Sequence, residues 1–334
     1  MALTFSIVIP VFNAAAYVED CLKSVSNQSF ADFECICVDD GSTDGSWDVL
    51  SAHACADSRF RPIRQANAGR GGARNAGLAA AKGDWICFLD ADDVLNRRTL
   101  ETYAEGIARN PNVDVVSLDA LEFEDDAEPA WGSDAKSDWR IVDTASRVPV
   151  EACCRPLWAC AYRNALAKDV RFGRLPFGED RVYYIQVLDR VRCMALNDFR
   201  GYAYRQHAES AVHAPLTAET FISDVRHAIA VMEIKAASKK AYADEVWRKH
   251  GLWFVERFVF AFFRLPEADR TRIWPEYLSS MRRACAFRQT PATVRCLLRL
   301  VLSVRSQRVM RVLCSTVYWM KRHGVNRHLA VHVK

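Results

Sequence analysis

Short hydrophobic runs alternate with helical patterns along the first third of this chain. The runs with the length and continuity of buried strands are residues 5–9, 33–38, 85–89 and 113–118. The segments with a helical period are residues 15–26, a stretch from Ser46, and residues 71–81 and 98–109. Strands that are apolar throughout and separated by helices are typical of a mostly parallel sheet covered by helices on both faces. We therefore expect an α/β fold of the Rossmann-like type.

The pattern changes further along the chain. Residues 119–149 are acidic and irregular, which predicts a long loop or small insertion over the site. A helical pattern returns at 150–167, a loop follows at 176–180, and everything after Pro215 reads as helix. We therefore expect a catalytic domain over 1–214, with halves at about 1–118 and 119–214, followed by a helical region over 215–334.

Polar residues follow three of the predicted strands. The segments are Pro10-Val11-Phe12-Asn13, Asp39-Asp40-Gly41-Ser42 and Asp90-Ala91-Asp92-Asp93. The carboxyl ends of parallel strands form one edge of a sheet, and ligands of such sheets bind there. The sequence therefore predicts that these residues converge on one binding site.

The carboxylates in this set suit a nucleotide-sugar. A leaving diphosphate is polyanionic, and a divalent metal held by carboxylates such as Asp90-x-Asp92 would neutralise it. A carboxylate at Asp39 can accept a hydrogen bond from a nucleobase N–H. For both motifs the alternative interpretation is a turn or a helix cap, with Asp92 or Asp93 satisfying backbone amides.

A glycine- and arginine-containing segment adds to the pattern. Asn67 to Asn75 supplies backbone amides, flexible glycines and the two arginines Arg70 and Arg74. A guanidinium offers a fixed fork for base carbonyls or phosphate. Taken alone, the segment could equally be a loop with solvated arginines.

Together these motifs resemble the inverting family 2 glycosyltransferases of the GT-A fold. The resemblance spans about residues 5–185, in the family's order. The matching residues are Ile7-Val8-Ile9-Pro10-Val11-Phe12-Asn13, Asp39-Asp40-Gly41-Ser42-Thr43-Asp44, Asn67-x-Gly69 with Ala73-Arg74-Asn75, Asp90-Ala91-Asp92-Asp93, and Trp158, Tyr162-Arg163, Phe172 and Gly178-Glu179-Asp180.

The resemblance implies a role for each matching residue. Pro10 and Phe12, with Asn13, would line the nucleobase pocket, and Asp39 would take the base N–H. The other donor-binding residues implied are Asn67, Arg74, Asp90 and Ala91, of which Arg74 would hold the base or the diphosphate and Asp90 the ribose. Asp92 would bind Mn²⁺ or Mg²⁺, and His207 is a further candidate metal ligand or an ordinary loop histidine.

The resemblance also implies the catalytic base. Asp180 would take the proton from the acceptor hydroxyl. Glu179 would support Asp180 by raising its basicity or by orienting the acceptor. The pair could also cap a helix that starts at Arg181.

Some positions depart from the family. Phe12 stands where tyrosine is common, and Cys160-Ala161 occupies a position that often carries lysine. The Gln-x-x-Arg-Trp signature of processive members is absent after Asp180. We therefore expect a non-processive enzyme that adds one sugar per encounter.

Charge is distributed unevenly. The net charge is +4, yet residues 277–334 hold 12 Lys/Arg and no Asp or Glu, which leaves 4 − 12 = −8 for the rest. In this tail, residues 291–322 predict basic amphipathic helices, either on an anionic membrane surface or packed on the body or a second subunit. Nucleic-acid binding is not expected, because the aromatic residues form no stacking platform.

The cysteines and the N-terminus indicate the compartment. There are 12 cysteines but no C-x-x-C pair, which favours reduced thiols. Residues 1–5 show no basic region of a secretory signal. We expect a cytoplasmic enzyme, peripheral at the inner face of the cell membrane.

The expected function is an inverting, metal-dependent transfer of one hexosyl or N-acetylhexosaminyl group. The donor would be a nucleoside diphosphate sugar, of the UDP type, and the acceptor a hydroxyl of a glycan or lipid-linked oligosaccharide of the cell envelope. One alternative is a sugar nucleotidylyltransferase, although the first strand lacks a glycine-rich triphosphate loop. Another is an inactive membrane-associated scaffold.

Overall fold

The computed structural model describes residues 3–132, 138–175, 178–207, 216–242 and 261–286. The chain divides into two compact units. Unit 1 comprises Met1–Ala214 and the short segment Ser238–Tyr242, whereas unit 2 comprises Pro215–Ala237 and Ala243–Lys334. The expected halves of the catalytic domain remain a prediction.

Unit 1 is built on a nine-stranded sheet with the order β3-β2-β1-β4-β9-β6-β10-β5, and β7 pairs with β10. The strands are β1 Phe5–Val11, β2 Phe33–Asp39, β3 Phe60–Arg64, β4 Trp85–Phe88, β5 Val94–Leu95, β6 Val115–Glu124, β7 Arg140–Asp143, β9 Cys160–Arg163 and β10 Cys193–Gln206. The four strands β3, β2, β1 and β4 are parallel, and β9 joins them to β6 by antiparallel pairing. The expected mostly parallel sheet is confirmed.

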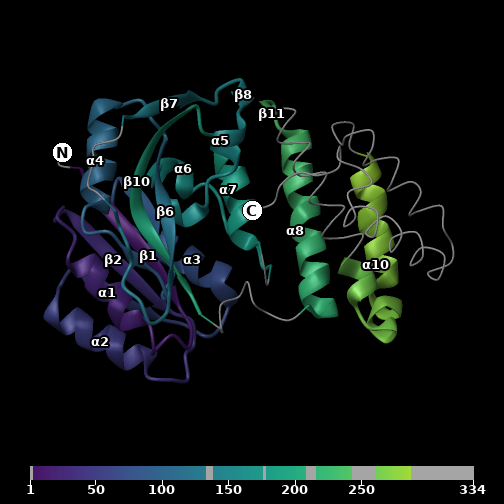
Figure 1. Ribbon diagram of the computed structural model, residues 1–334, viewed down its shortest axis with the longest axis horizontal. Coiled ribbons are helices and arrows are strands. Elements are labelled where there is room, and N and C mark those ends of the chain that lie inside the picture. Colours follow the sequence, from purple (N-terminus) through teal and green to yellow (C-terminus); the bar gives the residue numbers. More distant parts are fainter. Residues whose placement is uncertain (1–2, 133–137, 176–177, 208–215, 243–260, 287–334) are drawn as a thin grey trace. The chain divides into compact units, whose positions relative to one another are not determined.

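Helices cover both faces of this sheet, as Figure 1 shows. Helices α1 (Val18–Ser26), α2 (Ser46–Ala56) and α4 (Thr99–Arg109) lie on one face, and α3 (Gly69–Ala80), α6 (Asn164–Ala167) and α7 (Glu179–Leu188) lie on the other. Successive side chains of a strand point to opposite faces. Ile7 and Ile9 accordingly pack in one core with Leu22 of α1, whereas Val8 faces Gly77 of α3.

The structure corrects the expectation for residues 119–167. Strand β6 continues to Glu124, and β7 lies within the segment predicted to be a loop. The predicted helix at 150–167 consists of α5 (Val150–Cys153), the 3-10 turn η1 (Leu157–Ala159), β9 and α6. The short apolar run of β9 is compatible with either structure, and its position between β4 and β6 decides for a strand.

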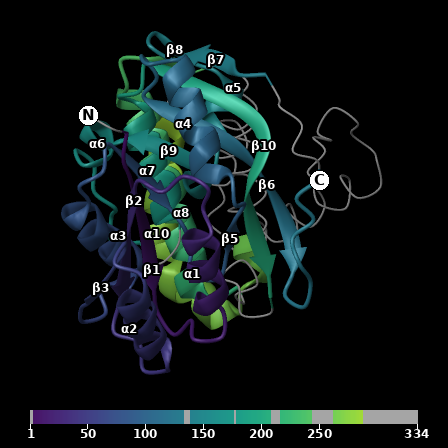
Figure 2. The same ribbon diagram turned by 90° about the vertical axis from the view of Figure 1, so that its left-hand side faces the viewer.

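Strands β3 and β10 were not predicted either. Strand β3 alternates arginine and proline with apolar residues, so it gives a weak hydrophobic signal. Strand β10 contains the polar stretch around Asp198 and Arg200, where its pairing with β6 is irregular. Figure 2 shows β10 curving alongside β6. This pairing carries the chain toward His207, just beyond the end of β10.

Unit 2 contains α8 (Ala218–Ala237), the 3-10 turn η4 (Ala261–Arg264) and α10 (Glu267–Ala286). Phe221, Phe262 and Tyr277 form a ring cluster, and the pairs Arg226–Glu276 and Arg283–Glu233 join α8 to α10. No described helix is long and apolar enough to cross a membrane. The predicted basic helices at 291–322 lie outside the described residues.

One two-residue strand interrupts the helical pattern after Pro215. Strand β11 (Ala241–Tyr242) pairs with β8 (Arg147–Val148) of unit 1. Lys240 Nζ, just before β11, donates hydrogen bonds to the carbonyls of Leu188 (3.0 Å) and Val191 at the end of α7. We call residues Ser238–Tyr242 the return segment, because they rejoin unit 1 after α8.

Candidate active site

The predicted polar residues lie at one edge of the sheet. Strands β2, β1 and β4 are adjacent and parallel, so their carboxyl ends share that edge. Asp39 is the last residue of β2, Phe12 follows β1, and Asp90 lies two residues beyond β4. The structure therefore brings together the three segments that the sequence selected.

The end of β1 presents an aromatic ring. Phe12 is 51 % exposed, which is unusual for so large an apolar side chain. Pro10 is buried in the strand beside Val38. Asn13 has a positive φ of 49°, and its Oδ1 accepts a hydrogen bond from Thr43 N at 2.9 Å. Asn13 thus ties the β1 loop to the β2 loop and leaves Phe12 available for stacking.

Asp39 is fully buried at the end of β2. Its Oδ1 accepts a hydrogen bond from Ser42 N at 3.1 Å. Its Oδ2 lies 3.0 Å from Arg64 Nε, close enough for an ion pair but without hydrogen-bond alignment. Arg64 is half exposed and lies over this carboxylate. The hydrogen bond from a base N–H to Asp39 stays a prediction.

The glycine-containing segment forms the start of α3. Asn67 Oδ1 accepts a hydrogen bond from Gly69 N at 3.2 Å, so this side chain shapes the loop. A Cβ on Gly71 would come within 2.9 Å of the Gly173 carbonyl and 3.5 Å of Glu179 Cγ. Glycine at this position therefore lets α3 approach the start of α7 closely.

Arg74 links the two halves of the site. Its Nη2 donates to Asp90 Oδ1 at 2.6 Å, and its Nη1 donates to Glu179 Oε1 at 2.8 Å. The side chain is only 2 % exposed, and these two contacts hold it between the carboxylates of Asp90 and Glu179. The contact with the base or diphosphate that the resemblance implied for Arg74 stays a prediction.

The two carboxylates that contact Arg74 have pKa values shifted in opposite directions. Burial tends to raise the pKa of Asp90, but the nearby Arg74 and Arg70 outweigh it and lower that pKa. Burial raises the pKa of Glu179 despite the same two arginines. The neighbours account for the difference: the hydrogen bond from Arg74 lowers the pKa of Asp90 further, whereas the adjacent negative charge of Asp180 raises the pKa of Glu179. Asp90 is the better-stabilised anion.

Asp92 meets His207 across the site. Asp92 Oδ2 and His207 Nε2 are 3.1 Å apart, and the Asp92 side chain is 33 % exposed. Ala91, between the two carboxylates, is buried. Within the described ranges no cluster of three or more His, Cys, Asp or Glu side chains could enclose a metal ion.

Asp180 lies in the first turn of α7, directly after Glu179. Its negative charge, like those of Asp90 and Glu179, raises the pKa of Arg74, although burial acts in the opposite direction. Asp180 is partly exposed, whereas Glu179 is buried against Arg74. The support that Glu179 was expected to give Asp180 stays a prediction.

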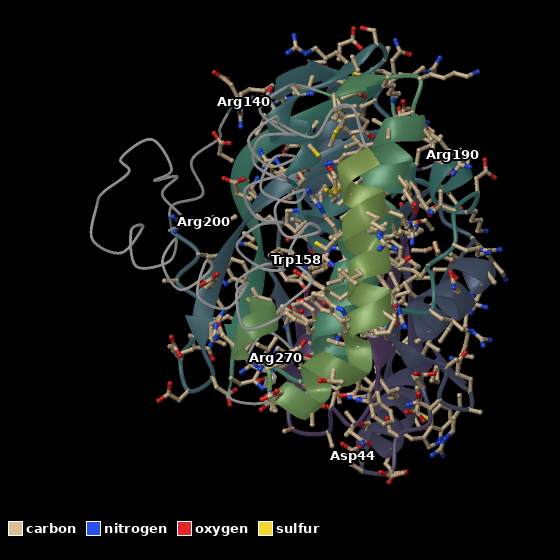
Figure 3. The ribbon with its side chains drawn as sticks, turned by 90° about the vertical axis from the view of Figure 1, so that its right-hand side faces the viewer. Asp44, Arg140, Trp158, Arg190, Arg200 and Arg270 are labelled. Atoms are coloured by element: carbon tan, nitrogen blue, oxygen red, sulfur yellow. The ribbon has the colours of Figure 1, made fainter. Side chains whose placement is uncertain are left out.

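Several residues of the site were not selected from the sequence. Tyr202 donates a hydrogen bond to the buried Asp93 and accepts one from Asp90 N at 3.2 Å. Trp158, labelled near the centre of Figure 3, stacks on Tyr202 with ring centroids 4.2 Å apart. Arg205 bonds the Asp92 carbonyl at 2.9 Å. The hydrogen bonds of Tyr202 and Arg205 join residues more than a hundred positions apart, so only the approach of β10 to the Asp90–Asp93 loop reveals them.

Known proteins share this domain. Residues 6–170 match the model of Glycosyl transferase family 2. The chain is 31 % identical over 224 residues to the putative glycosyltransferase EpsH of Bacillus subtilis, a match that covers 62 % of each chain. The chain therefore spans less than two thirds of that relative's length.

Solved structures share the fold. S. aureus TarS 1–349 in complex with UDP superposes with a TM-score of 0.70 at 19 % identity, covering 96 % of this chain and 92 % of TarS 1–349. The mannosyltransferase PcManGT from Pyrobaculum calidifontis, in complex with GDP-Man and Mn²⁺, has a TM-score of 0.51 at 14 % identity, covering 96 % and 86 %. By its match to the family model, the segment 6–170 is a Glycosyl transferase family 2 domain, and the chain shares its fold with these solved glycosyltransferases.

Proposed function

We propose that this chain transfers a single sugar from a nucleoside diphosphate sugar, of the UDP type, to a hydroxyl group of a glycan or lipid-linked oligosaccharide, with inversion at the anomeric carbon. The observation that carries the proposal is the double contact of Arg74 with Asp90 and Glu179. This contact joins the donor edge of the sheet to the helix that carries Asp180. The two carboxylate groups needed for donor binding and for proton transfer are thereby held in one site.

The donor half of the site suits a nucleotide. The exposed Phe12 ring offers a stacking surface for a base, and Asp39 offers an acceptor for its N–H. TarS has been solved with UDP and with UDP-GlcNAc, which supports a uridine donor. Asp90, ionised and fixed by Arg74, faces the next part of the donor, the ribose.

Asp92 and His207 fit a divalent metal. Carboxylate oxygen and imidazole nitrogen suit Mn²⁺, and carboxylate oxygen suits Mg²⁺. The Asp92 Oδ2 and His207 Nε2 atoms face each other at 3.1 Å, so the two side chains could hold one ion together. The Mn²⁺ complex of PcManGT supports the same cofactor. When bound, the ion would neutralise the charge that develops on the departing diphosphate.

Asp180 is the proposed base. Its carboxylate accepts the proton of the acceptor hydroxyl while that oxygen forms a bond to the anomeric carbon and the bond to the diphosphate breaks. Attack from the side opposite the leaving group inverts the configuration. Arg74 and Glu179 hold the start of α7 in place, so Asp180 is oriented before the acceptor arrives.

The acceptor class rests on the resemblance and on the basic tail. A membrane-bound or envelope glycan suits a chain whose last 58 residues carry 12 cationic and no acidic side chains. Peripheral attachment at the inner membrane face through residues 291–322, or self-association through the same helices, belongs to this proposal.

The proposal is tested by measuring UDP release from a panel of UDP-sugars in Mn²⁺, with and without glycan acceptors. Asp180→Asn is expected to abolish transfer and to leave UDP-sugar affinity unchanged, because the amide cannot take a proton. Affinity is measured by isothermal titration, and Asp198→Asn, at an exposed ion pair with Arg140, serves as the control. Loss of UDP-sugar binding in Asp180→Asn would assign this residue to the donor pocket instead.

The same assay separates the alternatives. A nucleotidylyltransferase would consume UTP and a sugar phosphate and release pyrophosphate. An inactive scaffold would bind UDP and Mn²⁺ without turnover. A chelator is expected to stop UDP release, and added Mn²⁺ to restore it.

A further inference from the structure

Arg205 occupies an unusual position beside the proposed metal site. It lies at the end of β10, two residues before His207, and its side chain is only 6 % exposed. All three of its guanidinium nitrogens donate hydrogen bonds. Nε donates to the Asp92 carbonyl at 2.9 Å, Nη1 to the Asp125 carbonyl and carboxylate at 3.2 Å each, and Nη2 to Asp20 Oδ2 at 3.1 Å.

The backbone of Arg205 adds another contact. Its N–H donates to Asp93 Oδ1 at 2.8 Å. Arg205 therefore joins the metal-motif loop, through Asp92 and Asp93, to α1 through Asp20 and to the segment after β6 through Asp125. These four side-chain hydrogen bonds engage every guanidinium nitrogen, so most of the donor capacity of Arg205 is used within the protein.

Aromatic rings extend the arrangement to His207. The Arg205 guanidinium lies 5.6 Å from the Tyr17 ring centre and 4.7 Å from that of Phe123. Tyr17 also packs against the His207 ring, with centroids 4.5 Å apart. His207 and Asp92 are thus each held by a group that Arg205 contacts: Asp92 through its own carbonyl, His207 through Tyr17.

We propose that Arg205 is a positioning residue that sets the geometry of the Asp92–His207 pair for a divalent cation. The inference rests on the proposed function, since it assumes that this pair binds the metal. Groups behind metal ligands typically control affinity by about 10–100-fold. Lysine cannot replace arginine, because an ammonium is a point donor that does not span the three acceptors with a planar fork.

The test compares Arg205→Lys with the wild-type chain. Mn²⁺ is titrated into protein saturated with UDP, and the electron paramagnetic resonance signal of the free ion reports binding. Arg205→Lys is expected to weaken Mn²⁺ binding by about 10–100-fold, with UDP affinity measured without metal unchanged. In turnover, the Mn²⁺ concentration for half-maximal rate rises, whereas kcat at saturating Mn²⁺ is retained.

Arg59→Lys is the matched control. Arg59 also makes a multiple contact, with Asp57 and the Ser26 carbonyl, and lies 4.3 Å from the Phe33 ring centre, away from the site. It is expected to bind Mn²⁺ as the wild type does. Thermal unfolding of both variants reports whether each is folded.

A double-mutant cycle separates positioning from a general loss of stability. If Arg205 acts through His207 and Asp92, the loss of Mn²⁺ affinity caused by Arg205→Lys is smaller in a His207→Ala background. Additive losses, or equal losses of metal-free UDP affinity, would overturn the inference. Absence of Mn²⁺ uptake by the wild-type chain with UDP would instead remove the proposed metal site, and the inference with it.

Discussion

At the scale of single residues, the sequence identified the acidic groups of the site but not what holds them. Asp39, Asp90 and Asp92 could be selected because carboxylates at strand ends follow a local pattern. The roles of Arg64, Arg74 and Arg205 could not, since an arginine's partner lies on another element and local spacing does not encode it. Arg74 is the clearest case. Its motif position suggested a contact with the donor, and the structure shows its buried guanidinium paired with Asp90 and Glu179.

Phe12 carries a prediction at this scale. Phe12→Ala is expected to weaken UDP binding by about 1–3 kcal/mol, the range for a base stacked on an aromatic ring. Because the ring is half exposed, the free energy of unfolding should change little. Isothermal titration with UDP and urea unfolding measure the two quantities. Phe12→Tyr, which keeps the ring, should bind UDP normally, and equal affinities for the alanine variant would place the base elsewhere.

At the scale of elements, the strongly apolar strands and amphipathic helices of the first half were predictable. Strand β9 was predicted as part of a helix. Its four residues come soon after Pro156 and lie between the short helices η1 and α6, so they carry no pattern of their own. Strand β3 contains arginines and a proline, and β10 contains charged residues, so their partners in the sheet, and not the local pattern, decide their structure. Pairing with neighbouring strands therefore determines the structure of β3, β9 and β10, which the periodicity of the sequence does not reveal.

The packing of α3 on β1 gives a second prediction. A Cβ on Gly77 would lie 2.3 Å from Val8 Cγ1, a distance that forces the helix away from the strand. Gly77→Ala should therefore lower the free energy of unfolding by about 1–3 kcal/mol, despite the higher helix propensity of alanine. Gly173→Ala, where nothing lies within 4 Å of the added Cβ, is the control in urea denaturation. Equal stabilities would mean that α3 shifts at little cost.

Glu34 of β2 connects neighbouring segments and gives a pH prediction. Burial acts to raise the pKa of Glu34, but hydrogen bonds from Ser6, the Lys82 N–H and Arg61 outweigh it and lower that pKa. The native ionised form is therefore favoured. Its stabilisation is fully present above the unfolded pKa of about 4.3 and is lost as the pH falls through the lower native value.

The measurement is urea unfolding at a series of pH values from neutral downward. In Glu34→Gln, the contribution of Glu34 to acid destabilisation is absent. Its free energy of unfolding should therefore fall less steeply with decreasing pH than that of the wild type below about pH 4.3. Parallel curves for the two proteins would show that other carboxylates account for the acid sensitivity.

At the scale of the whole molecule, the catalytic unit is not a continuous stretch of sequence. The sequence indicated a change of character near residue 215, where the strand pattern gives way to helices. It gave no sign that the return segment rejoins unit 1 after α8, because a two-residue strand and one lysine leave no periodic pattern.

Lys240 carries the prediction for this connection. Lys240→Met removes a cation from the carbonyls of Leu188 and Val191 and should lower the stability of unit 1 by about 1–3 kcal/mol. The neighbouring exposed Lys239→Met is the matched control. Hydrogen exchange along α7, followed by mass spectrometry, should show faster exchange near Leu188 in the first variant alone. Unchanged exchange there would mean that β11 holds the segment without the lysine.

The return segment also has a consequence during synthesis. When Ala214 is added to the nascent chain, the nine-stranded sheet is complete in sequence, but the partner of β8 and the cation at the end of α7 are still untranslated. They follow 242 − 214 = 28 residues later, which at typical elongation rates is a delay of about a few seconds. The nascent catalytic unit must wait through the synthesis of α8 before its last contacts can form. Rare codons within 215–242 would lengthen that interval, so the yield of folded enzyme should respond to codon choice there more than in the codons that follow.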